Sequence, residues 1–147
     1  MPVIAPKGLS HIAIRAEDVP RSAAFYERVF GYQVFLDERD KETNPRTMGV
    51  IGGAAVEIVK SAKPHARVDE EVPGYAVMSF SVDDIDAAHA ALTEAGVPRV
   101  GKVLTMGDVR LIFLRDPDGI LLEIIQLRGG AASMAEIGAK ALARASA

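Results

Sequence analysis

Two stretches of this 147-residue chain, GLSHIAIRAEDV at residues 8–19 and GYAVMSFSVDD at residues 74–84, share one outline and decide the fold. Each has an alternating run that is typical of a strand, followed by an aspartate that is typical of a helix N-cap. Apolar residues at helical spacing follow in both cases, up to a glycine that ends the predicted helix, Gly31 or Gly96. The chain therefore contains a strand–helix unit twice.

Further strands follow each predicted helix. After the first, residues 32–37 indicate a strand, residues 38–46 a charged loop, and residues 47–60 a hairpin that turns at Gly52 and Gly53. After the second, residues 99–105 indicate a short strand, and VRLIFLRD and ILLEIIQL indicate a hairpin around PDG. The order strand–helix–strand–strand–strand thus occurs twice, which predicts an α+β fold of two tandem βαβββ modules.

The spacing of equivalent residues supports a tandem duplication. Asp18 and Asp84 are separated by 66 positions, and so are Glu57 and Glu123, which predicts a constant offset across both modules. We expect a single domain over residues 1–147. Within it we expect module one over about 8–60, a linker over 61–74, module two over about 75–128 and an amphipathic C-terminal helix over about 132–145, which packs on the domain or on a partner chain.

Composition limits the functions open to the chain. The sequence is 49% hydrophobic and 25% charged, with a net charge of −3 and no basic patch, so nucleic acid is not an expected partner. It has no cysteine, which excludes disulfides, iron–sulfur clusters and thiolate zinc sites. The N-terminus lacks a signal-peptide pattern, and no apolar run approaches the ~18 residues of a membrane span. We therefore expect a cytoplasmic protein with no membrane partner.

Three polar residues stand in strand segments among apolar neighbours: His11, Glu57 and Glu123. Duplicated modules commonly pack around a pseudo-twofold axis, where equivalent positions converge. A carboxylate in the middle of an apolar run is costly to bury unless it is paired, protonated or bound to a metal. One imidazole and two carboxylates facing a cleft suit a divalent metal. The alternative is that each glutamate lies on a solvent face and that His11 is a core or edge histidine.

The chain resembles the vicinal oxygen chelate superfamily, which includes glyoxalase I, methylmalonyl-CoA epimerase, extradiol dioxygenases, and fosfomycin- and bleomycin-resistance proteins. The resemblance covers about residues 8–128 and rests on HIAIRAEDVPRSAAFYERVFGY, VEIV, FSVDDIDAAHAALTEAGV and FLRDPDGILLEII. It implies that the two modules form a curved mixed sheet around a cleft and that the protein is a homodimer. It leaves open whether the modules pair within one chain or are exchanged between two.

The resemblance also implies a set of metal ligands. Ligands in this family lie on the first and last strands of each module, which corresponds here to His11, Glu57, Val77 and Glu123. Valine cannot bind a metal, and Tyr75 is the nearest potential substitute. The resemblance therefore implies one divalent ion, Zn, Ni, Co, Mn or Fe, held by the two glutamates and the histidine, or no ion at all because Val77 replaces a usual ligand.

Two functions follow from the resemblance. The first is a metal-dependent lyase or isomerase in which Glu57 or Glu123 removes a proton next to a carbonyl of a small substrate. The second is a metal-free protein of the bleomycin-resistance type that sequesters a small molecule. Extradiol dioxygenase chemistry ranks low, because Val77 removes the second histidine that such enzymes need.

Substrate contacts are predicted on the same strands. Arg15 stands four residues after His11, where glyoxalase-like relatives have an arginine that grips a substrate carboxylate. The alternative is that Arg15 pairs with an acidic residue at the sheet edge. Tyr75 and Val77 lie on one face of the equivalent strand and complete the predicted substrate-binding residues.

Overall fold

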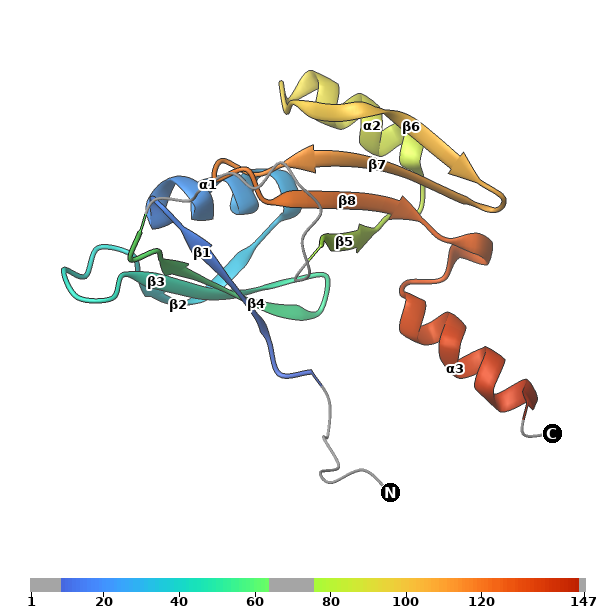
Figure 1. Cartoon of the computed structure of the whole chain (residues 1–147), viewed down its shortest axis with the longest axis horizontal. Coiled ribbons are helices and arrows are strands. Elements are labelled where there is room, and N and C mark those ends of the chain that lie inside the picture. Colours follow the sequence, from blue (N-terminus) through green and yellow to red (C-terminus); the bar gives the residue numbers. More distant parts are fainter. Residues whose placement is uncertain (1–8, 64–75, 146–147) are drawn as a thin grey trace. The chain divides into compact units, whose positions relative to one another are not determined.

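The computed structural model describes residues 9–63 and 76–145 (Figure 1). The chain divides into two compact units, Met1–Val68 and Asp69–Ala147. Each unit has its own four-stranded sheet and a helix between its first two strands. Most of the predicted linker, and Tyr75 with it, lies outside the described residues. None of the described helices is long and apolar enough to cross a membrane.

The first unit is a βαβββ module. Its strand order is β1-β4-β3-β2, in which β1 is parallel to β4 and the other pairs are antiparallel. Its elements are β1 (Ile12–Ala16), α1 (Val19–Phe30), β2 (Gln33–Glu38), β3 (Arg46–Ile51) and β4 (Ala54–Lys60).

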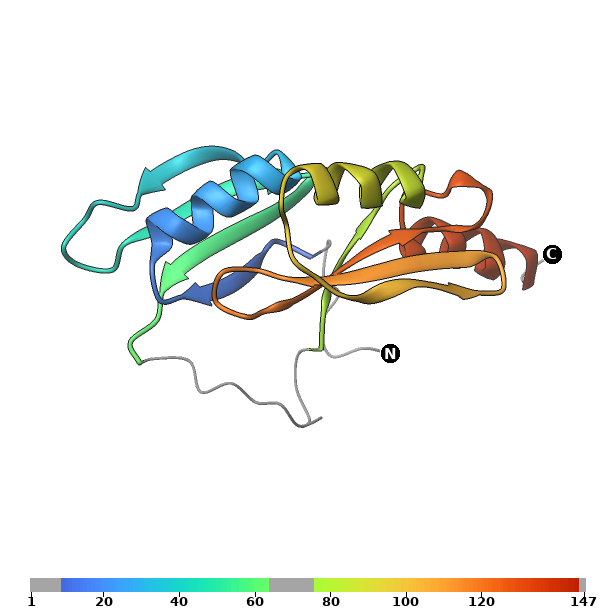
Figure 2. The same cartoon turned by 90° about the horizontal axis from the view of Figure 1, so that it is seen from above.

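The second unit repeats this arrangement with the order β5-β8-β7-β6, in which β5 is parallel to β8. Figure 2 shows α2 lying along one face of this sheet. The predicted α+β fold of two tandem βαβββ modules followed by a helix is therefore confirmed. The elements are β5 (Met78–Ser81), α2 (Ile85–Glu94), β6 (Arg99–Met106), β7 (Val109–Arg115), β8 (Leu121–Gln126), the short turn η1 (Arg128–Gly130) and α3 (Met134–Ala145).

The helix boundaries follow from the predicted capping residues. Asp18 accepts a hydrogen bond from the backbone N–H of Arg21, at 2.9 Å. Asp84 accepts two from the start of α2, at 2.8 and 3.1 Å. Gly31 and Gly96 follow the helices with φ of 65° and 67°, a conformation that glycine adopts without strain. Local sequence therefore sets both ends of each helix.

The predicted constant offset of 66 is wrong in the middle of the modules. Tyr32 and Val97 are equivalent in the chain segment after each helix, and Gly49 and Leu114 are equivalent in the third strands, yet both pairs are 65 positions apart. The segment at the end of α2 is one residue shorter than that of α1. The turn between β7 and β8 is one residue longer than the Gly52–Gly53 turn, so the offset returns to 66 in the last strands.

Each sheet has one face covered by its helix and one that is not. In the first unit α1 packs on β3 and β4, and alternate strand residues such as Ile14, Val56 and Ile58 are buried. The intervening residues, including Ala13 and Glu57, point to the helix-free face and are exposed or half-buried. This alternation decides which side chains are available for chemistry.

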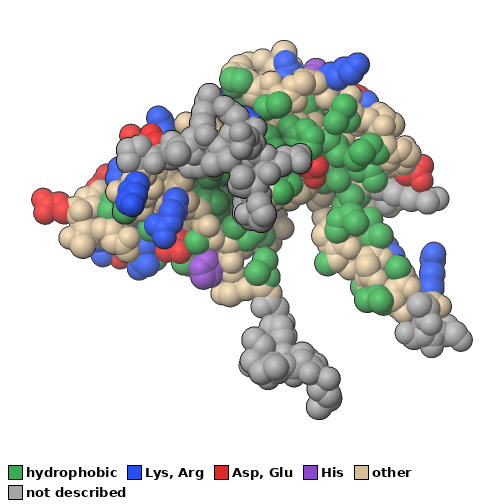
Figure 3. Space-filling view, in the orientation of Figure 1, with side chains coloured by type: hydrophobic (Ala, Val, Ile, Leu, Met, Phe, Trp, Pro, Cys, Tyr) green, Lys and Arg blue, Asp and Glu red, His purple; other side chains and the backbone are tan. Residues whose placement is uncertain are grey.

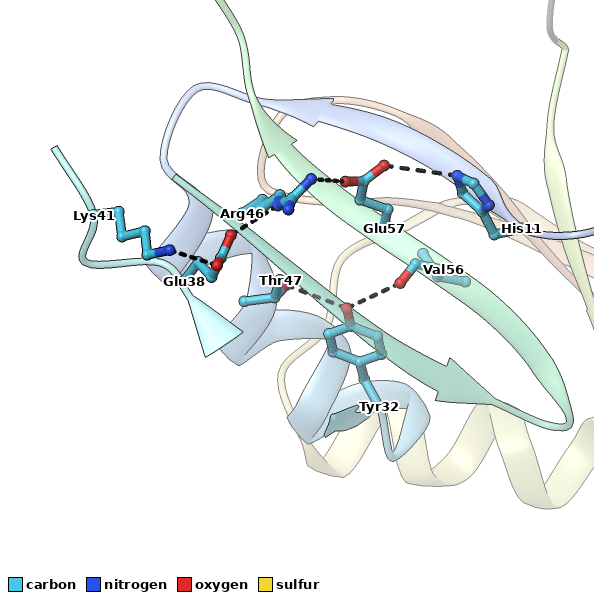
Figure 4. Close-up of polar contacts among 8 residues, drawn as sticks. All are labelled: His11, Tyr32, Glu38, Lys41, Arg46, Thr47, Val56 and Glu57. Carbon is cyan, nitrogen blue, oxygen red and sulfur yellow. Dashed lines mark hydrogen bonds and ion pairs between the residues drawn. The ribbon is translucent and has the colours of Figure 1, made fainter. Parts of the chain in front are cut away.

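The buried Tyr32 ring packs against β3 on the helix-covered face of the first sheet. Its hydroxyl donates to the carbonyl of Val56 at 3.0 Å and lies 3.2 Å from Oγ1 of Thr47 (Figure 4). Burial raises the pKa of Tyr32 above its ordinary value. The ring lies over Gly49, where an added Cβ would be 2.4 Å from Cε2 of the tyrosine. A glycine is therefore required at this point in β3.

Gly49→Ala should destabilise the protein. Its Cβ would also lie 2.5 Å from the carbonyl oxygen of Gln33, which belongs to the backbone and cannot rotate away. Overpacking of this kind lowers the free energy of unfolding by about 1–3 kcal/mol, measured by urea denaturation. Gly138→Ala in α3 is the control, because the space around Gly138 is open. A Gly49→Ala protein as stable as the wild type would contradict the close approach.

Asp84→Ala should weaken the second unit by removing the acceptor for two backbone N–H groups at the start of α2. The expected loss in the free energy of unfolding is about 1 kcal/mol. Asp84→Asn keeps a capping oxygen and should retain most of the stability. Equal losses in the two variants would show that the negative charge, not the cap, is what matters.

Candidate metal-ligand site

The structure brings His11 and Glu57 together. His11 immediately precedes β1, one residue outside the strand that was predicted to include it, and Glu57 lies in the centre of β4. Because β1 and β4 are parallel neighbours with Ala13 opposite Glu57, the histidine projects beside the carboxylate. Nε2 of His11 is 3.7 Å from Oε2 of Glu57, with side-chain exposures of 38% and 15% (Figure 4). The predicted pair is thus adjacent and open to solvent.

An arginine approaches Glu57 from the other side. Nη1 of Arg46 is 3.5 Å from Oε1 of Glu57, and Nε of Arg46 donates to Glu38 at 2.9 Å (Figure 4). Lys41 donates to the other oxygen of Glu38 at 2.5 Å. Hydrogen bonds from Lys41 and Arg46 lower the pKa of Glu38, and Glu38 in turn raises the pKa of Arg46. Glu57 therefore lies between the imidazole of His11 and the guanidinium of Arg46, and Glu38 holds that guanidinium in place.

Sequence reasoning missed Arg46 and Glu38, because both fall in the segment predicted as a charged loop. The structure places Glu38 at the end of β2 and Arg46 at the start of β3, directly opposite one another. Pairs of opposite charges on facing strand residues are common in sheets. Such a pair can be recognised only when the strand register is known.

Glu123 occupies the equivalent position in the second unit and has different neighbours. It lies in β8, opposite Ser79 of β5 and Phe113 of β7. The hydroxyl of Ser79 donates to Oε1 of Glu123 at 2.5 Å. Among residues 9–63 and 76–145, no cationic side chain forms an ion pair with Glu123. Sequence analysis predicted the carboxylate but not its serine partner.

The histidine and the arginine beside Glu57 have apolar counterparts in module two. Val77 stands where module one has His11, and buried Leu111 stands where module one has Arg46. The space-filling view shows the same contrast between the units: charged side chains of both signs cover the first unit, and mainly hydrophobic ones cover the visible face of the second (Figure 3). The two related carboxylates therefore lie in unlike surroundings.

The predicted substrate contact Arg15 lies on β1. Arg15 is exposed on β1, on the same side as Ala13, as the alternation predicted. In the described parts of the chain no ion pair involves Arg15. Its role in binding a substrate carboxylate stays a prediction. Tyr75 lies outside the described residues, and Val77 is half-buried just before β5.

The His11–Glu57 pair fits two positions of a divalent-metal site. Ligands bound to one ion at about 2.0–2.2 Å lie roughly 3–4 Å from each other, and the observed 3.7 Å falls in that interval. Imidazole nitrogen and carboxylate oxygen are also a common donor combination for such ions. Within the described residues no group of three His, Asp or Glu side chains is close enough to hold an ion. Two of the predicted ligands, His11 and Glu57, lie in the first unit, and the third, Glu123, lies in the second.

The first unit also contains a cavity that does not involve these ligands. It has a volume of about 300 Å³ and lies at the C-terminal ends of β1 and β4, the opposite end of the strand pair from His11. It is lined by Glu17, Lys60, Ser61, Ala62 and Lys63.

Known proteins similar to this chain span nearly its whole described length. The chain is 33% identical to the uncharacterized protein YaeR of Escherichia coli, covering 82% of this chain and 96% of that protein. It is 27% identical to a probable lactoylglutathione lyase of Vibrio parahaemolyticus, covering 84% of this chain and 94% of the relative.

Solved structures show the same fold. The fosfomycin resistance protein FosX of Listeria monocytogenes, crystallised with Mn(II) and sulfate, superposes with a TM-score of 0.65 at 19% identity, over 85% of this chain and 96% of FosX. A sequence profile of the Glyoxalase/Bleomycin resistance protein/Dioxygenase superfamily matches residues 8–124, which cover the first βαβββ module and the second as far as Ile124 in β8. On the strength of this match across the repeated modules, the chain belongs to the Glyoxalase/Bleomycin resistance protein/Dioxygenase superfamily.

Proposed function

We propose that this protein is a metal-dependent lyase or isomerase that removes the proton next to a carbonyl group of a small substrate. The observation that carries the proposal is the placement of His11 Nε2 at 3.7 Å from Glu57 Oε2 on a solvent-accessible sheet face. Two likenesses support it: a relative is named probable lactoylglutathione lyase, and a protein of the same fold was crystallised with Mn(II).

His11, Glu57 and Glu123 are the proposed ligands of one divalent ion, Zn, Ni, Co, Mn or Fe. Three protein ligands leave positions for substrate oxygens, as is usual in catalytic sites. When bound, such an ion supplies Lewis-acid polarisation of the substrate carbonyl, which makes the neighbouring C–H group more acidic. Val77 would then line the substrate site rather than hold the ion.

We infer different roles for Glu57 and Glu123 from the residues around them. Glu57 is held from both sides by His11 and Arg46, which restrict its movement. Glu123 has a hydroxyl partner and an apolar facing residue, Phe113, and no described cation beside it. Among the described residues only its Oε1 takes part in a hydrogen bond, so its Oε2 is available to a substrate proton. Glu123 is therefore the proposed base, a ligand that would loosen from the ion to act, and Glu57 is the proposed static ligand.

The substrate-binding residues follow from their positions. Arg15 lies exposed on the same side of β1 as His11 and Ala13, and its guanidinium suits a substrate carboxylate. Tyr75 and Val77 are proposed to contact the same substrate from module two. The proposed assembly is a homodimer, as the family resemblance implies.

Val77 favours one alternative, a metal-free protein that sequesters a small molecule. Valine removes a nitrogen ligand at a position where its counterpart, His11, could bind an ion. Metal content decides between the two functions.

Tag-free protein purified without chelator should contain about one divalent ion per chain, measured by inductively coupled plasma mass spectrometry. His11→Ala and Glu57→Gln should lose the ion, because each removes one of two adjacent ligands. Glu94→Gln, an exposed acid on α2, is the matched control and should keep it. A wild-type protein that takes up no ion after soaking with Zn, Ni, Co, Mn and Fe would contradict the enzyme proposal and favour sequestration.

Glu123→Gln should abolish turnover while preserving the fold. Loss of the base should lower kcat by about 10²–10⁴-fold, the usual contribution of a positioned proton acceptor. The substrates tested are a panel of thiohemiacetals of α-ketoaldehydes and a panel of thioesters. The measured quantity is the exchange of the substrate C–H proton with deuterated solvent. An unchanged melting temperature would show that the variant has lost activity and not its fold. Full activity in Glu123→Gln would overturn the role of Glu123 as the base, and full activity in Glu57→Gln as well would overturn the whole mechanism.

A further inference from the structure

The duplicated strands place different residues opposite the two carboxylates. In the parallel β1–β4 pair, Ala13 lies opposite Glu57. In the parallel β5–β8 pair, Ser79 lies opposite Glu123. Ala13 and Ser79 are equivalent residues, because they are 66 positions apart in segments where that offset holds. The hydroxyl is therefore present in module two and not at the equivalent position of module one.

The Ser79 hydroxyl makes a short and specific contact. Its Oγ is 2.5 Å from Oε1 of Glu123, in the range of a hydrogen bond to a charged oxygen. Ser79 is exposed on the helix-free face, so its side chain does not fill the core. Removing an exposed hydroxyl seldom changes stability much. The contact is therefore better explained by what it does to Glu123 than by packing.

We propose that Ser79 is a positioning residue, which holds Glu123 by Oε1 and leaves Oε2 to take the substrate proton. The inference rests on the proposed role of Glu123 as the base. The terminal torsion of a glutamate is broad and almost unrestrained, so a free carboxylate samples many orientations. A hydrogen bond to one oxygen restricts that rotation and presents the other oxygen in a fixed direction, as proton transfer within hydrogen-bond reach requires.

The same strand provides a matched control. Ser81 lies two residues further along β5 and is also exposed, but its hydroxyl donates to the backbone carbonyl of Ala132 instead of a carboxylate. Ser81→Ala therefore removes a hydroxyl and a hydrogen bond from the same face without altering Glu123. A difference between Ser79→Ala and Ser81→Ala reports on the carboxylate contact alone.

The first test is steady-state kinetics on a substrate that the wild type turns over. Ser79→Ala should lower kcat about tenfold with KM nearly unchanged, the size of effect expected when a supporting hydrogen bond to a site residue is lost. Ser79→Thr keeps the hydroxyl and should restore most of kcat, and Ser81→Ala should match the wild type. Wild-type kcat in Ser79→Ala, or an equal loss in Ser81→Ala, would overturn the positioning role.

The second test needs no turnover. In metal-free protein carrying ¹³C at the glutamate carboxyl carbons, the Glu123 resonance is identified by its absence in Glu123→Gln. It should move in Ser79→Ala and stay in place in Ser81→Ala. A resonance that does not move would overturn the contact itself.

The two proposals fail in distinguishable ways. If wild type and Glu123→Gln are equally inactive on every substrate, the proposed function fails, and the positioning role fails with it even where the resonance moves. If the wild type is active, Glu123→Gln is inactive and Ser79→Ala is unimpaired, only the role of Ser79 fails.

Discussion

The parallel pairing of the first and last strands in each module is the constraint on which the site depends. Parallel strands cannot be joined by a tight turn, so the helix and two further strands must lie between them in sequence. The pairing sets β1 beside β4 in one register, and His11 reaches Glu57 only because Ala13 lies opposite that glutamate. The same register in β5 and β8 gives Glu123 its serine. The contacts of Glu57 with His11 and of Glu123 with Ser79 therefore join strands that lie far apart in the chain.

Much of this fold could be predicted from the sequence, because its signals are local. A capping aspartate, a glycine after the helix and a Gly-Gly or PDG turn each act within a few residues, and they located both helices and both hairpins. Alternation in LSHIAIR and AAVEIVK put the right residues on the helix-free face. The one-residue shift in the repeat was missed, since a shortening at the end of α2 and a lengthening at the β7–β8 turn cancel before the last strand.

The candidate site was only partly predictable. His11 and Glu57 stood out because each is a polar residue within an apolar segment. Arg46 and Ser79 did not stand out. An arginine in a predicted charged loop and a serine in an exposed strand position are ordinary in any sequence. Their importance lies in facing the carboxylates across the sheet, and cross-strand register is not encoded in the order of residues alone. Membership of the superfamily does not remove this limit, because one fold supports many reactions and the side chains decide among them.

The unlike partners of Glu57 and Glu123 have a consequence for how such a protein can evolve. An assembly of two identical single-module chains would be bound by symmetry, so every substitution beside one carboxylate would appear beside the other. Fusion of the modules into one polypeptide lifts that restriction. A histidine could be kept in one half while valine was accepted in the other, and a hydroxyl could be gained at position 79 while position 13 kept a methyl group. Each half can therefore be selected, or engineered, for its own task without altering its counterpart.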